Sequence, residues 1–111
     1  MSKIQVIMCP AERAPYVTNI QDSLDNMQKI VGGYIETAKI AKDTIIVCNE
    51  EGRILGMPEN NSLPVSGFCG DCFICAVDGD RMVSLDNQGK QFFLRSCRDR
   101  WNSLWEEKHG N

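Results

Sequence analysis

Histidine is nearly absent from this sequence, and its single occurrence, His109, lies close to the C-terminus. Chain ends are commonly frayed, so a mechanism that needs a positioned imidazole is disfavoured. The sequence also lacks a glycine-rich phosphate loop, a nucleophile elbow and an H-E-x-x-H motif. No catalytic residue is therefore predicted, and the balance favours a protein that is not an enzyme, without deciding the question.

Long hydrophobic runs are missing as well. The apolar stretch from Ile4 to Cys9 is too short for a signal peptide or a membrane span, and no other run approaches the length of a span. Because no export signal is seen, the six cysteines are expected to be thiols in a reducing compartment. We expect a soluble, cytoplasmic protein with no membrane partner.

An excess of positive charge is also lacking, since the formal net charge is −3. The overall field would repel a phosphate backbone, which disfavours nucleic acid as a partner. The 111 residues, 42% of them hydrophobic, can bury one core but not two. We therefore expect a single domain over residues 1–111, with a compact core over about 3–106 and a frayed tail over 107–111.

Hydrophobic periodicity predicts two strands and a helix in the first third of the chain. Residues 3–9 alternate imperfectly and end at Pro10, and residues 16–20 form a second extended segment, so the two are expected to pair as a hairpin. Asp22 or Ser23 can cap a helix that ends at Gly32. The apolar positions of this helix recur at helical spacing: Leu24, Met27, Ile30 and Val31.

Further strands are predicted in the middle of the chain. The continuous apolar run 45–48, after a β-branched segment over 33–40, is typical of a strand buried on both faces, and we expect it at the centre of the sheet. Residues 54–55 are expected to complete a hairpin before a loop. Residues 65–77 are expected to form a long segment that turns at Asp78-Gly79 into 82–85.

An amphipathic helix is expected to begin near Asp86, with these residues on its core side: Phe93, Cys97, Trp101, Leu104 and Trp105. No internal repeat, low-complexity tract or linker composition divides the chain. The elements together predict the α+β class. The expected architecture is a small, mostly antiparallel sheet of hairpins, with a short helix after the second strand and a longer amphipathic C-terminal helix.

Three closely spaced cysteines form the most conspicuous motif, because the C-x-x-C-x-x-C spacing of Cys69, Cys72 and Cys75 resembles the start of a ferredoxin cluster motif. That motif continues with a fourth cysteine and a proline, where this chain has Gly79 and Asp80. In a strand, moreover, Cys72 would face away from the other two. We interpret the three as small buried hydrophobic residues and predict neither metal nor cofactor, with a metal or redox site as the alternative.

Two charged groups each have a functional and a structural interpretation. Acidic side chains that could flank a pocket are more often a solvated face: Glu36, Asp43, Glu50 and Glu51. Basic residues accompany the two tryptophans of the final helix, as in proteins that bind single strands: Arg95, Arg98, Arg100 and Lys108. Helical spacing assigns the tryptophans to the core side. A small nucleic-acid-associated regulator is therefore only the second alternative.

Several motifs closely resemble the family described as domain of unknown function 3846: QKIVGGYIE over 28–36, CNEEG over 48–52, and Gly56-Met57-Pro58. Later motifs are similar in order and spacing, so the resemblance covers residues 3 to about 105: Gly67-Phe68, Asp78-Gly79-Asp80 and Val83-Ser84-Leu85. It implies a small accessory protein of phages or bacterial mobile elements, with no established reaction. The family pattern has Asn-Arg where this chain has Asn60-Asn61, and it does not include the cysteine motif.

The leading hypothesis is a non-enzymatic binding module that acts in a bacterial host cell on a host protein or a small signalling ligand, with counter-defence as a role such binding would serve. The candidate binding residues lie at the ends of two predicted strands and in their turn: Tyr34, Glu36, Asn49, Glu50, Glu51 and Arg53. A nucleotide-type ligand would stack on Tyr34 and meet the charge of Arg53. The oligomeric state is left open.

Overall fold

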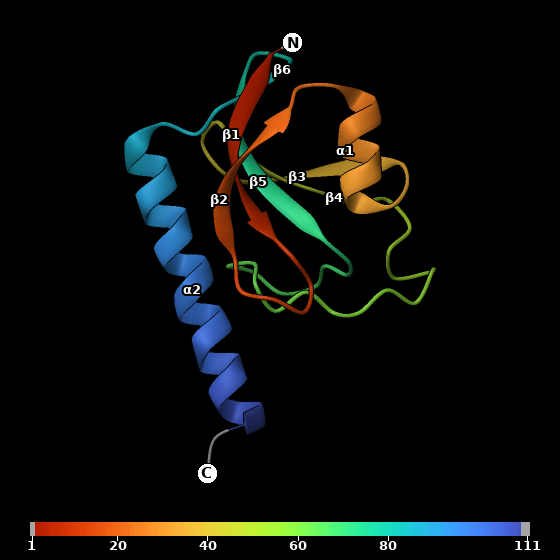
Figure 1. Cartoon of the computed structure of the whole chain (residues 1–111), viewed down its shortest axis with the longest axis vertical. Coiled ribbons are helices and arrows are strands. Elements are labelled where there is room, and N and C mark those ends of the chain that lie inside the picture. The colour runs from red at the N-terminus through yellow and green to blue at the C-terminus, as the bar shows by residue number, and fades with distance from the viewer. Residues whose placement is uncertain (1, 110–111) are drawn as a thin grey trace.

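The computed structural model of the chain describes residues 2–109. Six strands form one antiparallel sheet in the order β2-β1-β5-β4-β3, with β6 paired to β5 (Figure 1). The strands are β1 Lys3–Cys9, β2 Tyr16–Gln21, β3 Ile35–Ala41, β4 Thr44–Asn49, β5 Cys72–Asp78 and β6 Arg81–Val83. The helices are α1 Leu24–Val31 and α2 Asn87–His109. The predicted α+β architecture, with its short and long helices, is confirmed.

Side chains of the three inner strands alternate between the two faces of the sheet, as strand geometry requires. One face packs under α1, and its buried cluster includes Val6, Val47 and Phe73. The other face packs under α2, and its buried cluster includes Ile7, Ile46, Ile74, Leu63, Phe93 and Cys97. Both faces of the sheet are therefore covered, which explains why β4 is buried along its whole length.

Helix α1 begins and ends where its capping residues predict. The Ser23 hydroxyl accepts a 3.2 Å hydrogen bond from the backbone N–H of Asn26, so Ser23 rather than Asp22 is the N-cap. Gly32 adopts a left-handed φ of 79° and donates its N–H to the carbonyl of Gln28, which closes the last turn. Met27 and Val31 are the buried residues of this helix.

Three sequence predictions about the sheet are wrong in detail. Residues 54–55 lie in successive turns rather than in a strand, and Ile54 is 83% exposed. The long segment predicted over 65–77 becomes a strand only at Cys72, because Gly67 and Gly70 adopt positive φ values of 102° and 83°. The centre of the sheet is β5 rather than the 45–48 run, which lies beside it in β4.

Helix α2 is longer than the sheet it covers. Its 23 residues span about 35 Å at a rise of about 1.5 Å per residue. Phe93 and Cys97 are buried against the sheet, whereas Trp105 is 49% exposed, so the prediction that the tryptophans lie on the core side is wrong for the last turns. The predicted tail over 107–111 overlaps the end of α2, and residues 110–111 lie outside the described residues. No helix within residues 2–109 is long and apolar enough to cross a membrane.

Candidate functional site

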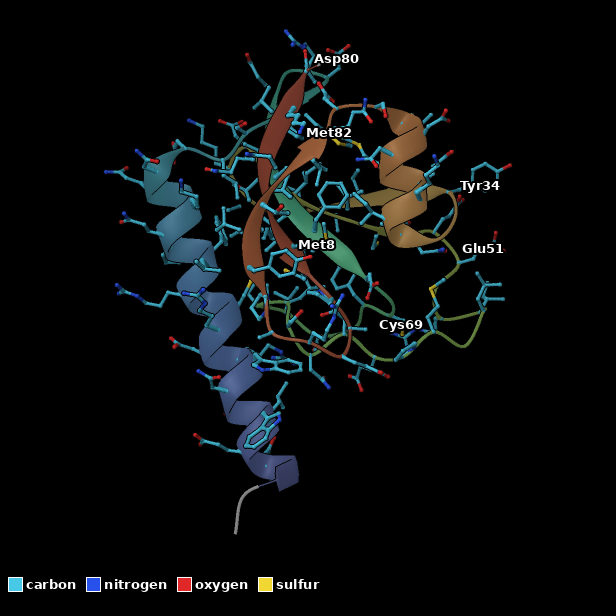
Figure 2. The ribbon with its side chains drawn as sticks, in the orientation of Figure 1. Met8, Tyr34, Glu51, Cys69, Asp80 and Met82 are labelled. Carbon is cyan, nitrogen blue, oxygen red and sulfur yellow. The ribbon has the colours of Figure 1, made fainter. Side chains whose placement is uncertain are left out.

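The pairing of β3 with β4 brings the candidate binding residues to one end of the sheet. Ile35 is opposite Asn49 and Glu36 is opposite Cys48 in the antiparallel register. The backbone N–H of Glu50 also donates a 2.9 Å hydrogen bond to the carbonyl of Tyr34, which extends the pairing into the turn. In Figure 2, Tyr34 and Glu51 lie on the same side of the molecule, and both side chains point away from the sheet.

Four of the six candidate residues line one small pocket of about 190 Å³, here called the strand-end pocket. It is lined by Glu36, Cys48, Asn49, Glu50, Gly52, Arg53, Gly67, Phe68 and Cys69. Tyr34 and Glu51 are not among the lining residues. The structure therefore gathers the two carboxylates Glu36 and Glu50 with the Arg53 guanidinium, and leaves the Tyr34 ring outside the pocket.

Asn49 holds this end of the sheet together. It is 6% exposed, its Nδ2 donates a 3.1 Å hydrogen bond to the carbonyl of Val31, and its Oδ1 accepts a 2.7 Å bond from the N–H of Glu51. A Cβ atom at Gly33 would lie 2.8 Å from this Nδ2, so glycine is needed for the close approach. Asn49 thus positions α1, β4 and the 50–51 turn relative to one another.

Two loops that are distant in sequence meet across the pocket. Arg53 Nη2 donates a 2.9 Å hydrogen bond to the carbonyl of Gly67. Gly52 is buried against the other loop, because a Cβ atom there would lie 2.8 Å from the carbonyl oxygen of Cys69. Sequence reasoning did not find the contribution of residues 67–69. The glycine at position 52 is a sequence signal that could have pointed to this close contact.

Three exposed apolar side chains are close in sequence or pairing to residues that line the strand-end pocket. Tyr34 is 68% exposed, Ile54 is 83% exposed and Leu55 is 59% exposed. We call these three residues the apolar rim. Each rim residue is close to a residue that lines the pocket. The Tyr34 carbonyl accepts a hydrogen bond from the N–H of Glu50, and Ile54 and Leu55 directly follow Arg53 in the sequence. Exposed apolar residues grouped around charged ones are typical of a surface that contacts another protein.

The three cysteines of the C-x-x-C-x-x-C motif do not converge. Cys75 belongs to the cluster under α1 and Cys72 to the cluster under α2, while Cys69 lies in the loop before β5 and pairs with Glu59 in an isolated bridge. Burial raises the pKa of Cys72 and that of Cys75 to about 12. Within residues 2–109, no group of three or more His, Cys, Asp and Glu side chains could hold a metal ion.

Two other cysteine sulfurs lie close together. Cys9 Sγ on β1 is 3.9 Å from Cys97 Sγ on α2, and both residues are free thiols with no exposed surface. The hydrogen bond with Cys97, followed by burial, raises the pKa of Cys9 well above its ordinary value. Burial, followed by the charge of Glu36, raises the pKa of Cys48 to about 11. The Cys9 and Cys48 thiols are therefore protonated at neutral pH, the state in which cysteine is a poor nucleophile.

A second, larger pocket of about 350 Å³ lies beside the last turns of α2 and is here called the tryptophan pocket. It is lined by Ala11, Glu12, Pro58, Glu59, Asn61, Trp101, Leu104 and Trp105. The basic residues Arg95, Arg98 and Arg100, which sequence analysis grouped with the tryptophans, do not line it. Lys108 belongs to that group as well, but its side chain is outside the described part of the structure. Sequence reasoning missed this pocket because it treated both tryptophans as core.

Comparison with known protein families gives one match. The family model described as Domain of unknown function (DUF3846) matches residues 4–97. The matched segment contains β1 except Lys3, the strands β2 to β6, α1 and the whole strand-end pocket, and it ends before Trp101. No curated protein and no solved structure matches the chain.

Proposed function

This chain belongs to the DUF3846 family, and from that premise we propose that it is a non-enzymatic accessory binding module of phage or mobile-element type. In this proposal it binds a host protein in the bacterial cytoplasm, and interference with a host defence is one role that such binding would serve. The binding surface consists of the strand-end pocket and the apolar rim. The observation that carries the proposal is that Glu36, Asn49, Glu50 and Arg53 gather on one pocket.

The geometry supports a protein partner better than a small signalling ligand at this surface. A pocket of about 190 Å³ is smaller than the roughly 300–1,000 Å³ of typical small-molecule sites. The Tyr34 ring, which would have to stack on a nucleotide base, does not line the pocket. A protein partner would instead bury the apolar rim and pair its polar groups with Glu36, Glu50 and Arg53.

Two leucines of equal exposure allow a matched test. Leu55 in the apolar rim is 59% exposed and Leu24 at the start of α1 is 58% exposed. Immobilised wild-type protein, Leu55→Ser and Leu24→Ser would each be used to capture partners from a bacterial lysate, and the captured proteins would be quantified by mass spectrometry. We expect wild type and Leu24→Ser to retain the same partner, and Leu55→Ser to retain about ten-fold less.

Equal retention by the two leucine variants, or no partner retained by the wild type, would contradict the proposal. Tyr34→Ala and Arg53→Ala refine it, because each residue is exposed and the two contribute different chemistry. Unchanged retention in either variant would remove that residue from the binding surface. Arg53→Ala also removes the hydrogen bond to the Gly67 carbonyl, so the folding of this variant would be checked by circular dichroism before the capture is interpreted.

A further inference from the structure

The last turns of α2 pass beyond the sheet and lie beside two loops instead. Trp101, Leu104 and Trp105 occur at i, i+3 and i+4, so they share one face of the helix. That face lines the tryptophan pocket opposite residues from the β1–β2 loop and from the 58–61 loop. Figure 1 shows this part of α2 continuing past the strands, with both loops at the same end of the molecule.

The loops that form the opposite wall are held by buried polar groups. Asn60 is 1% exposed, and its Nδ2 donates 2.8 Å hydrogen bonds to the carbonyls of both Cys9 and Gly70. Ser62 is fully buried, and its Oγ donates a 2.6 Å bond to the carbonyl of Pro10. The wall is therefore fixed without a ligand, which reduces the conformational entropy that binding would cost.

Among the side chains that the structure describes, the charged ones that line the pocket all have the same sign. Its charged lining side chains are Glu12 and Glu59, and its aromatic lining side chains are the two indoles. Of the basic residues whose side chains the structure describes, Arg13, Arg98 and Arg100 are near the lining residues in sequence, and none of the three lines the pocket. An indole face carries negative electrostatic potential, so the indoles and the carboxylates favour the same kind of ligand.

From this combination we infer that the tryptophan pocket binds a small organic cation with a methylated ammonium group. Such a group has an apolar surface and a positive charge, so it is attracted to the faces of the indole rings. Because it is weakly hydrated, the free-energy cost of removing it from water is small. The volume of about 350 Å³ falls within the range of roughly 300–1,000 Å³ for small-molecule sites. This inference concerns a different surface from the proposed protein-binding site and does not depend on it.

The two tryptophans make the inference directly measurable. The chain contains only two tryptophans, and both line this pocket, so the tryptophan fluorescence of the full chain reports on the pocket alone. The protein would be titrated with choline and, separately, with its neutral carbon isostere, in which a tert-butyl group replaces the trimethylammonium group. Sodium chloride would keep the ionic strength constant. We expect a saturable change in fluorescence with choline. The isostere should bind at least about ten-fold more weakly.

Exchange of carboxylates for amides tests the charge separately from the shape. Glu12 and Glu59 are exposed, so the double variant Glu12→Gln/Glu59→Gln is expected to fold normally and to bind choline about ten-fold more weakly. Glu36→Gln, at the strand-end pocket, is the matched control and should bind choline as the wild type does. The inference would be overturned by equal affinity for the two compounds, by no saturable response to choline, or by unchanged binding in the double variant.

Discussion

The side-chain amide of Asn60 donates a 2.8 Å hydrogen bond to the carbonyl oxygen of Cys9, a residue 51 positions earlier in the chain. The same nitrogen also bonds the carbonyl of Gly70, and the side-chain oxygen accepts from the N–H of Ser62. One buried amide thus ties the 58–62 loop to the end of β1 and to the loop before β5. Both candidate pockets contain residues from these tied segments.

Removal of this amide is expected to destabilise the protein strongly. Asn60→Ala removes the amide that donates to the buried carbonyls of Cys9 and Gly70, so we expect the free energy of unfolding to fall by about 2–3 kcal/mol. The neighbouring half-buried residue provides a control, and Asn61→Ala is expected to change the free energy by less than about 0.5 kcal/mol. Urea unfolding followed by circular dichroism measures both. Equal losses in the two variants would show that Asn60 does not have this role.

The β-strands could be predicted from the sequence where apolar and polar residues alternate within one short segment. Alternation over residues 3–9 predicts which side chains of β1 face each helix, and Ser23 and Gly32 mark the ends of α1. Ile54 and Leu55 misled the prediction because an apolar pair was assumed to be buried. The tryptophans misled it because helical spacing identifies one face of a helix, but not the point at which the sheet beneath that face ends.

The candidate site could be predicted only in part, for a related reason. The start of β3 and the end of β4 belong to one hairpin, so their meeting follows from local antiparallel pairing. The 67–69 loop reaches the same pocket through long-range contacts, namely the bridge between Glu59 and Cys69 and the bond from Arg53 to Gly67. No periodicity in the sequence reports contacts of that kind.

Asn49 is expected to act on folding rather than on a partner directly. Asn49→Ala removes the bonds to Val31 and Glu51, and we expect a loss of about 1–3 kcal/mol in the free energy of unfolding. Asn19→Ala, at an exposed position of β2, serves as the control and should have little effect. Loss of partner capture by an Asn49→Ala protein of unchanged stability would instead identify Asn49 as a direct contact.

Alkylation is expected to distinguish one cysteine from the other five. Cys69 is half-buried, whereas Cys9, Cys48, Cys72, Cys75 and Cys97 are buried. With iodoacetamide at neutral pH, we expect Cys69 to react first and the others to react only on unfolding, as peptide mass spectrometry would measure. Fast modification of Cys72 or Cys75 in the folded protein would support the redox alternative instead.

Stability is expected to fall at alkaline pH because of the buried thiols. Burial holds the pKa of Cys72 and of Cys75 at about 12, against an ordinary value of about 9, so the unfolded chain loses these protons first. The stabilising effect is complete below about pH 9 and is lost as the pH rises towards about 12. Urea unfolding across this window, with a reductant present, should give a falling free energy. The double variant Cys72→Ala/Cys75→Ala should show a flatter dependence.

The proposed binding surface is tested most directly by site-specific photo-cross-linking inside a bacterial host cell. A photoreactive amino acid would replace Leu55 in the apolar rim or, as the matched control, the equally exposed Leu24 on α1. If the apolar rim contacts a host protein, position 55 gives a cross-linked product of one defined mass that contains that host protein, and position 24 does not. Cross-links of the same kind from both positions, or none from position 55, would contradict the proposal.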